Sequence, residues 1–236
     1  MSGDPGKQLP LALPHRPALS REDFLVTPAN EEAVAWLDRW PDWPGHALAL
    51  HGPRGCGKTH LVHVFAAQSG AAILTAGELP GEDVPYLLAH HRAVVVEEAD
   101  RLMPDAAVEE GLFHLWNLVK ERGAHLLLTG ETPPARWKGT LPDLRSRLST
   151  AQTVAIAPPD DLLMEAVLLK LFFDRQLRVA PEVVAFLLRH MERSFAAARE
   201  TVAAADALSL AERRDITVPL IRRVLVATDR GNSATP

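Results

Sequence analysis

The sequence feature that most constrains this chain is a glycine-rich stretch between an apolar run and a helical pattern. Residues 51–59 read HGPRGCGKT, the apolar run is Ala47–Leu50, and the helical pattern begins at Lys58. The spacing Gly-x-x-x-x-Gly-Lys-Thr between a strand and a helix predicts a loop that cradles phosphate groups. An ordinary glycine-rich turn is the alternative, and the complete pattern in its strand–helix context favours the phosphate loop.

Each residue type in this loop has a physical reason. Glycines let the backbone curl so that several N–H groups point inward at phosphate oxygens, and the following helix aims its positive end at the same anion. We expect Lys58 to reach the β- and γ-phosphates and the Thr59 hydroxyl to hold Mg²⁺. The predicted nucleotide-binding residues of this segment are Gly52, Pro53, Arg54, Gly55, Cys56, Gly57, Lys58, Thr59 and His60.

Composition excludes several other classes of protein. The 236 residues are enough for one large or two small domains, and a net charge of -5 argues against a large nucleic-acid-binding surface. Cys56 is the single cysteine, so we expect neither an intramolecular disulfide nor a thiol metal cluster. Because there is no apolar run of about 18 residues and no secretory signal, we expect a cytoplasmic protein that does not bind membranes.

The order of patterns predicts three parts. Residues 1–20 are rich in proline and glycine and predict a flexible, extended tail. Residues 21–157 alternate strands and helices, which predicts an α/β domain with a parallel sheet, and residues 158–236 contain helical patterns only, which predicts a small all-α domain. The strands expected after the loop are 72–75, 93–96, 125–129 and 153–156.

The first helix is expected from Glu31 to Trp40, with Asn30 as its N-cap. Trp36 and Trp40 in this helix, with Trp43 just beyond it, are better explained as core residues than as a stacking platform.

Leucines alternate in the tail at Leu9, Leu11 and Leu13, where no local core can bury them. A hydrophobic segment of this kind is a candidate ligand for a groove on another protein. The alternative is that it folds back on its own domain, and physical reasoning alone leaves both options open.

Polar residues follow two of the predicted strands. Glu97 and Glu98 end the run 93–96 and could ligate Mg²⁺ and polarise an attacking water, or form a solvated strand end. Thr129 and Glu131 lie at the tip of another strand, where they could sense a phosphate or cap a loop.

The same order of motifs resembles that of AAA+ ATPases and, among them, the bacterial replication initiator DnaA. Phe24-Leu25-Val26 resembles the segment before the first helix of DnaA, which implies that Phe24 and Val26 line an adenine pocket. Residues 128–134 resemble its first sensor, which implies a nucleotide contact at Glu131. Residues 144–148 resemble its arginine-finger segment, and Arg147, rather than Arg145, matches the finger, which acts on a nucleotide held by a partner.

Two features narrow the resemblance to the Hda family of regulatory inactivators of DnaA. The chain ends after the helical domain, without the DNA-binding domain of the initiator, and its tail carries Gln8-Leu9-Pro10-Leu11. In that family a tail motif of this kind docks in the groove of the DNA polymerase sliding clamp. The resemblance covers residues 8–227 and implies clamp binding by Gln8, Leu9, Leu11 and Leu13, which favours the clamp over self-packing.

The chain departs from the initiator pattern at several positions. Glu97 stands where DnaA has a magnesium-binding Asp, with Glu98 as the following catalytic acid, and Glu131 replaces the first-sensor Asp. Ala196 falls where a second-sensor arginine is expected, and Arg193 or Arg199, one helical turn to either side, could substitute for it. We therefore expect weak intrinsic ATP hydrolysis.

The resemblance implies a negative regulator of replication initiation that binds ADP or ATP with Mg²⁺. Tethered to the DNA-loaded clamp, and so to DNA only indirectly, it would stimulate hydrolysis of ATP bound to DnaA through Arg147. Formation of a homo-oligomer is left open. The alternatives are a stand-alone ATPase that remodels or loads a helicase, and an adaptor that binds the initiator without triggering hydrolysis.

Overall fold

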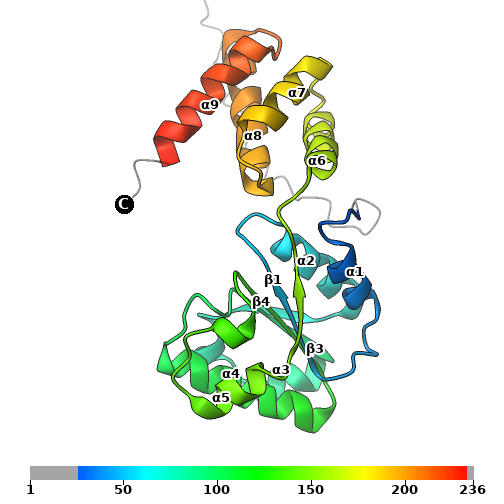
Figure 1. Cartoon of the computed structure of the whole chain (residues 1–236), viewed down its shortest axis with the longest axis vertical. Coiled ribbons are helices and arrows are strands. Elements are labelled where there is room, and N and C mark those ends of the chain that lie inside the picture. The colour runs from blue at the N-terminus through cyan, green and yellow to red at the C-terminus, as the bar shows by residue number, and fades with distance from the viewer. Residues whose placement is uncertain (1–25, 233–236) are drawn as a thin grey trace, which may run out of the picture.

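The structure, a computed structural model, describes residues 26–232 and consists of a sheet unit and a helical unit (Figure 1). The chain passes from one to the other after the last strand, through residues 156–160. Elements pack mainly within each unit, so each has its own core. The α/β architecture followed by a helical lid is the fold that the sequence predicted.

Five parallel strands form the sheet in the order β2-β3-β4-β1-β5. Their bounds are β1 Ala47–His51, β2 Ala72–Thr75, β3 Ala93–Glu97, β4 His125–Gly130 and β5 Gln152–Ala155. The three central strands are apolar and almost wholly buried, as expected for a parallel sheet covered on both faces. Because all strands run the same way, the polar residues that follow β1, β3 and β4 meet at one edge.

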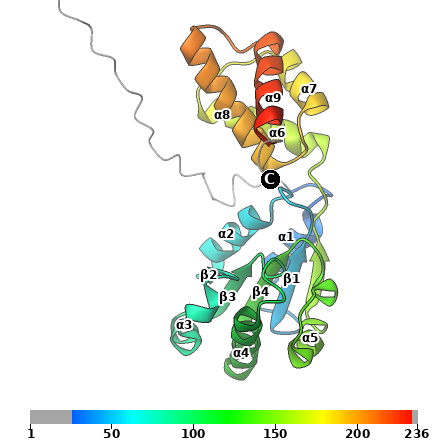
Figure 2. The same ribbon diagram turned by 90° about the vertical axis from the view of Figure 1, so that its left-hand side faces the viewer.

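Helices cover both faces of the sheet (Figure 2). Their bounds are α1 Glu31–Asp38, α2 Lys58–Ser69, α3 Val84–His90, α4 Ala106–Arg122 and α5 Pro142–Leu148, with short 3-10 turns η2 Leu79–Gly81 and η3 Pro134–Arg136. α1 ends two residues earlier than predicted. The cause is Pro41, which disfavours helical backbone at the residue before it, Trp40.

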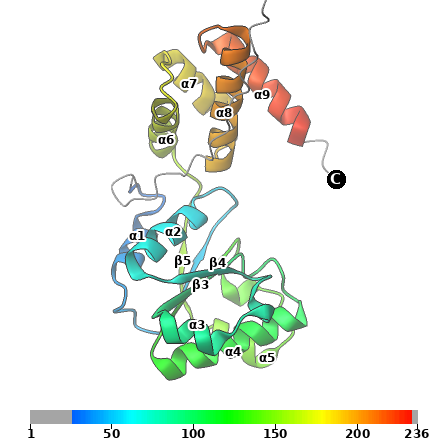
Figure 3. The ribbon, with the colours of Figure 1, turned by 180° about the vertical axis from the view of Figure 1, so that it is seen from behind.

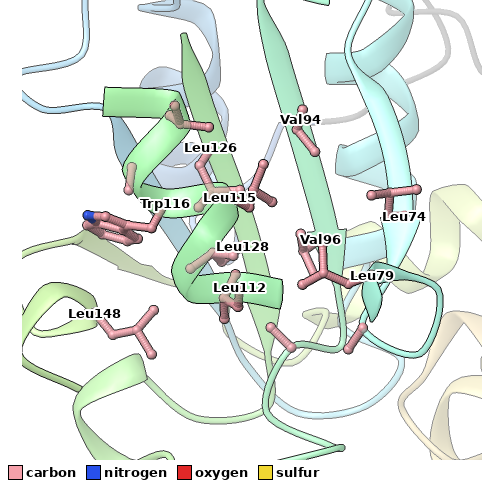
Figure 4. Packing of buried hydrophobic residues seen from close by; sticks show 14 of the residues in the cluster. Leu74, Leu79, Val94, Val96, Leu112, Leu115, Trp116, Leu126, Leu128 and Leu148 are labelled. Carbon is pink, nitrogen blue, oxygen red and sulfur yellow. The ribbon is translucent and has the colours of Figure 1, made fainter. Parts of the chain in front are cut away.

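The longest helix of the sheet unit, α4, supplies most of the packing on one face. The Asp105 side chain caps its first turn by accepting hydrogen bonds from the N–H groups of Ala107 and Val108. Its apolar stripe lies against the strands, as Figure 4 shows for Leu112, Leu115 and Trp116 facing Leu126 and Leu128 of β4.

The opposite face is packed by α1 and α2. The Trp43 ring stacks on Phe65 of α2 at 5.7 Å between centroids, and Trp36 and Trp40 border the same cluster. The prediction that these tryptophans belong to the core is confirmed.

The helical unit contains α6 Asp161–Asp174, α7 Pro181–His190, α8 Phe195–Glu212 and α9 Val218–Asn232 (Figure 3). Their shared core includes Leu168, Phe172, Leu187, Val202 and Ile221, all at most 1% exposed. Within the described residues, no helix combines the length and apolar character that crossing a bilayer requires.

We predict that Leu128→Ala lowers the unfolding free energy of the sheet unit by about 2–5 kcal/mol, because Leu128 is fully buried and its truncation leaves a cavity. Urea unfolding followed by tryptophan fluorescence measures this, since all five tryptophans precede residue 158. Leu102→Ala is the control; with Leu102 44% exposed, its cost is expected to be under about 1 kcal/mol. Equal losses in the two variants would contradict the packing described above.

Candidate functional site

The loop between β1 and α2 has the backbone that a phosphate cradle requires. Gly57, the N-cap of α2, has φ +102°, a conformation that side chains with a Cβ rarely adopt. At Gly52 the constraint is space, because a Cβ would lie 2.3 Å from the carbonyl oxygen of Ile156. The loop therefore opens onto the N-terminus of α2, whose first N–H groups have no partner within the helix.

Lys58 lies across this loop. Its Nζ donates hydrogen bonds to the carbonyl oxygens of Gly52 at 2.6 Å and Pro53 at 2.9 Å. It also lies 3.8 Å from the buried Cys56 sulfur, and burial raises the pKa of that thiol. Thr59 is exposed and His60 is half-buried at the start of α2. A phosphate that enters the loop would therefore meet an ammonium group, a hydroxyl and backbone N–H groups.

The loop is tied to the tip of β4 by an ion pair. Arg54 Nε donates to Glu131 Oε1 at 2.5 Å, and this hydrogen bond lowers the pKa of Glu131. The Asp100 carboxylate accepts from the N–H groups of Glu131 at 2.7 Å and Thr132 at 3.3 Å. The sequence reasoning missed Asp100, although it lies only two residues beyond Glu98.

The carboxylates after β3 are placed at the same edge. Glu98 is exposed, has φ +53° and forms an ion pair with Arg101, and its N–H donates to the Thr129 hydroxyl at 3.0 Å. Glu97 is half-buried at the end of β3. The structure thus brings the ends of β1, β3 and β4 together, and the Thr129 hydroxyl joins the ends of β3 and β4.

The donor set suits a magnesium nucleotide better than a metal held by protein alone. Among residues 26–232, no group of three or more His, Cys, Asp or Glu side chains could hold a metal ion. Mg²⁺ commonly takes only one or two protein ligands and completes its shell with waters and phosphate oxygens. A hydroxyl at Thr59 and a carboxylate at Glu97 are ligands of the right type for that arrangement.

Arg147 lies far from the loop. It lines a surface pocket of about 330 Å³ together with Gly45 and His46, which precede β1, whereas the loop follows β1. Arg147 Nε donates to Asn117 Oδ1 at 3.0 Å, and the guanidinium covers the Phe113 ring at 4.4 Å. The sequence reasoning missed these two partners, which are one turn apart on α4. They lie about 30 residues before Arg147 of α5 in the sequence, and no sequence pattern indicates that the two helices meet there.

A third contact holds Arg147 within its own helix, because Nη1 donates to the Asp143 carbonyl oxygen at 3.0 Å. Arg145, two residues earlier in α5, is exposed.

The lid arginines do not approach the loop through any contact in the described structure. Arg193 forms an ion pair with Asp161 of α6 at 2.7 Å, and Arg199 is exposed, as is Ala196 at the expected second-sensor position. The lid residues that do touch the loop are Ser194 and Phe195, which the sequence reasoning missed.

The adenine-pocket and clamp-binding predictions are only partly covered by the structure. Val26 begins the described part and is 51% exposed. Three residues later, the Ala29 carbonyl oxygen accepts from the N–H of Ala157, which leads toward the lid. The other predicted residues, Gln8, Leu9, Leu11, Leu13 and Phe24, lie outside the described residues.

Two histidines at opposite ends of strands have pKa values below that of an ordinary histidine. Burial lowers the pKa of His51, which ends β1, and the positive charges of Arg136 and Lys58 lower it further. Burial is also the main reason that the pKa of His125, at the start of β4, is lowered.

Known proteins resemble the chain in two ways. Residues 166–225 match the family described as Hda, lid domain. Domain III of the Thermotoga maritima replication initiation protein DnaA superposes with a TM-score of 0.78 at 17% identity, covering 91% of this chain and 98% of that one. AMPPCP-bound DnaA from Aquifex aeolicus gives a TM-score of 0.68 at 17% identity, covering 84% and 69% of the two chains.

The same fold extends to a motor protein. The Thermotoga maritima RuvB Holliday junction branch migration motor gives a TM-score of 0.63 at 16% identity, covering 84% of this chain and 66% of that one. At these identities the structural matches establish the fold, which this chain shares with DnaA and RuvB.

We predict that stability falls as pH drops from about 7.5 to 5.5. The folded pKa values of His51 and His125 lie below the ordinary 6.5, so the unfolded chain binds more protons and gains relative stability as pH falls through that value. His51→Gln should flatten this dependence, measured as urea-unfolding midpoints by tryptophan fluorescence. His114→Gln, at an exposed position, is the matched control; a His51→Gln profile as steep as wild type would refute the assignment.

Proposed function

Because this chain is an AAA+ protein related to Hda and DnaA, we propose that it is a negative regulator of the initiation of chromosome replication. It acts on ATP bound to the initiator DnaA and promotes its hydrolysis to ADP. The observation that carries the proposal is the place of Arg147, at the opposite end of β1 from the chain's own phosphate loop. With five residues at ~3.3 Å each, β1 separates the two by roughly 16 Å, and this separation supports a role for Arg147 on a nucleotide held by a partner.

The chain's own loop holds an adenine nucleotide, either ADP or ATP, with Mg²⁺. The backbone of residues 52–57, Lys58 and Thr59 contact the phosphates, and Glu97 supplies a carboxylate for the metal. A DnaA of the same fold carries AMPPCP, which supports this assignment. Phe24 and Val26 line the adenine. When bound, the nucleotide supplies an anion that both the loop and the start of α2 stabilise.

Arg147 is suited to act in trans because its guanidinium is already oriented. Nε donates to Asn117 and Nη1 to the Asp143 carbonyl oxygen, and the guanidinium lies over the Phe113 ring. The remaining N–H groups face a γ-phosphate on DnaA, where a cation stabilises the charge that spreads over the phosphoryl group. Such an arginine is worth about 10³–10⁵ in rate in related systems.

Intrinsic hydrolysis by this chain is weak. Glu98, the residue that would activate water, forms an ion pair with Arg101, and Glu131 forms one with Arg54. Both carboxylates are therefore engaged by arginines of the chain itself. The chain acts mainly as an activator of its partner, and Arg193 and Arg199 of the lid remain the candidates for a second contact to phosphate.

Localisation comes from the tail. Gln8, Leu9, Leu11 and Leu13 dock in the groove of the DNA polymerase sliding clamp, and the clamp connects the chain to DNA. With a net charge of -5, the chain needs no large basic surface of its own for this role. The residues that bind the clamp lie in the N-terminal tail, and Arg147 lies in α5. The chain can therefore use different segments for the clamp and for DnaA.

We predict that Arg147→Ala abolishes stimulated hydrolysis of ATP on DnaA. The assay follows radiolabelled ATP bound to DnaA in the presence of this chain and DNA-loaded clamp. A loss of at least about 10³-fold is expected because the trans cation is gone. Arg145→Ala is the matched control, since Arg145 is exposed in the same helix, and it should retain stimulation.

The same assay separates the alternative functions. Hydrolysis that needs all three components and fails with Arg147→Ala supports the trans-activator. If this chain alone hydrolyses ATP at the rate seen with all three components, a stand-alone ATPase is favoured. A verified assembly of the three components without stimulated hydrolysis favours an adaptor.

We predict that Leu9→Ala combined with Leu11→Ala abolishes clamp binding and spares nucleotide binding, because apolar anchors carry most of the affinity of peptide ligands. Surface plasmon resonance on immobilised clamp measures the first property and titration with a fluorescent ADP measures the second. Leu19→Ala, elsewhere in the N-terminal segment, is the control. Undiminished clamp binding by the double variant would reject the tethering role of the tail.

A further inference from the structure

The lid touches the phosphate loop at the start of α8. The N–H of Phe195, the first residue of that helix, donates to the Gly55 carbonyl oxygen at 3.1 Å. Figure 1 shows this end of α8 facing the top of the sheet unit, above the loop that follows β1. The contact joins residues 140 positions apart in sequence, and it is made by backbone atoms on both sides.

Side chains extend the contact along the loop. A Cβ placed on Gly55 would lie 2.4 Å from the Cβ of Ser194, and one on Gly57 would lie 2.8 Å from Cε2 of Phe195. Both distances are shorter than real Cβ contacts, so Ser194 and the Phe195 ring pack directly against the bare Cα atoms of the two glycines. Two positions that a phosphate loop needs as glycine are therefore also the positions on which the lid rests.

The hydrogen bond to Gly55 fixes the direction of one loop peptide. A trans peptide is planar, with its C=O and N–H groups pointing in opposite directions. Since the Gly55 carbonyl points to α8, the N–H of Cys56 points away from the lid. There it donates to the Pro53 carbonyl oxygen over a long distance of 3.4 Å. That long bond is easily exchanged for a better acceptor, so the lid holds a loop donor ready for an anion.

The Phe195 ring cannot move independently of the lid. It is half-buried and packs against the core that α6, α7, α8 and α9 share. Ser194, just before it, caps α8 through a bond from the Ala197 N–H to its Oγ at 3.1 Å. A rotation of the lid must therefore break the Gly55 bond or reshape the loop, and a reshaped loop must move the lid.

We infer that Phe195 is a positioning residue for nucleotide binding, which couples lid orientation to the state of the phosphate loop. Phe195 directly precedes Ala196, which stands where the resemblance to DnaA implies a second-sensor arginine. The nearby Arg193 is paired with Asp161. The inference rests on the proposed binding of a nucleotide by the loop. It adds that the lid contacts the loop itself and holds it in a receptive shape.

Two variants separate the ring from the backbone bond. Phe195→Ala removes the ring and keeps the N–H. Phe195→Pro removes both, and it suits the helix because proline is favoured at the first helical position and Ser194 already has extended backbone, φ −141° and ψ 148°. Phe173→Ala is the matched control, because Phe173 is a lid phenylalanine in α6 that is 79% exposed.

The first measurement is affinity for methylanthraniloyl-ADP with Mg²⁺. We expect Phe195→Ala to weaken binding by about two- to tenfold, which is what losing one modest contact costs, and Phe195→Pro to weaken it further. Phe173→Ala should bind like wild type. Circular dichroism spectra matching wild type show that each variant is folded.

The second measurement detects the coupling itself in the wild-type chain, and a variant is needed only to assign the resonance. The full chain is labelled with 4-fluorophenylalanine, whose seven ¹⁹F resonances include Phe195, assigned by its loss in Phe195→Leu. We expect the Phe195 resonance to shift on addition of MgADP, while the exposed Phe173 resonance stays in place. A residue with a purely structural role in the lid would not respond to the ligand.

The outcomes are distinguishable. If wild type fails to bind the nucleotide, or Lys58→Ala binds it equally well, the proposed function of the loop is wrong and the inference falls with it. If wild type binds, Lys58→Ala does not, and both Phe195 variants keep wild-type affinity with an unmoved ¹⁹F resonance, the inference alone is overturned. Weakened binding in the Phe195 variants together with a ligand-dependent shift supports it.

Discussion

The rest of the structure depends on how β1 passes into α2. β1 lies between β4 and β5, and its register with both fixes where the chain must turn. At that turn Gly52 passes so close to the Ile156 carbonyl oxygen that a Cβ has no room. The loop beyond is thereby held between the strand and the N-terminus of α2. The other candidate residues of the described sheet unit lie either at the same end of β1 as this loop or, like Arg147, at the opposite end.

The sequence was a good guide wherever the determining interactions are local. The apolar runs of the strands predicted these elements within a residue or two, because burial leaves an apolar pattern that can be read directly from the sequence. It failed where partners lie far apart in the chain. The Arg54–Glu131 pair spans 77 positions and the Arg147–Asn117 pair spans 30, and neither side chain carries a local sign of its partner. The contact of Phe195 with Gly55 was hidden for the same reason, and also because a glycine offers no side chain to suggest one.

Electrostatics at the sheet edge follow from the same geometry. Parallel strands bring Glu98, Asp100 and Glu131 to one end, and three carboxylates there would repel both each other and a nucleotide. Arg101 and Arg54 offset two of them, while Asp100 is directed at backbone N–H groups. At this edge of the sheet, arginines of the protein itself therefore partly neutralise the negative charge of the carboxylates. These ion pairs are largely exposed, so their value lies in orientation more than in stability.

The two ends of β1 differ in kind, and this difference has a consequence for assembly. At one end the loop can accept a phosphate, and at the other Arg147 presents a cation that its own loop cannot use. Two chains of this fold that meet through such unlike surfaces would form a head-to-tail contact, in which one chain gives the arginine and the other gives the nucleotide. The proposed function therefore separates two properties: hydrolysis at a chain's own site, which depends on carboxylates such as Glu98, and the surface with Arg147, which acts on a neighbour. Under the proposed function, the nucleotide in the loop helps to hold the shape of this chain, whereas the hydrolysis that the chain promotes takes place on its partner.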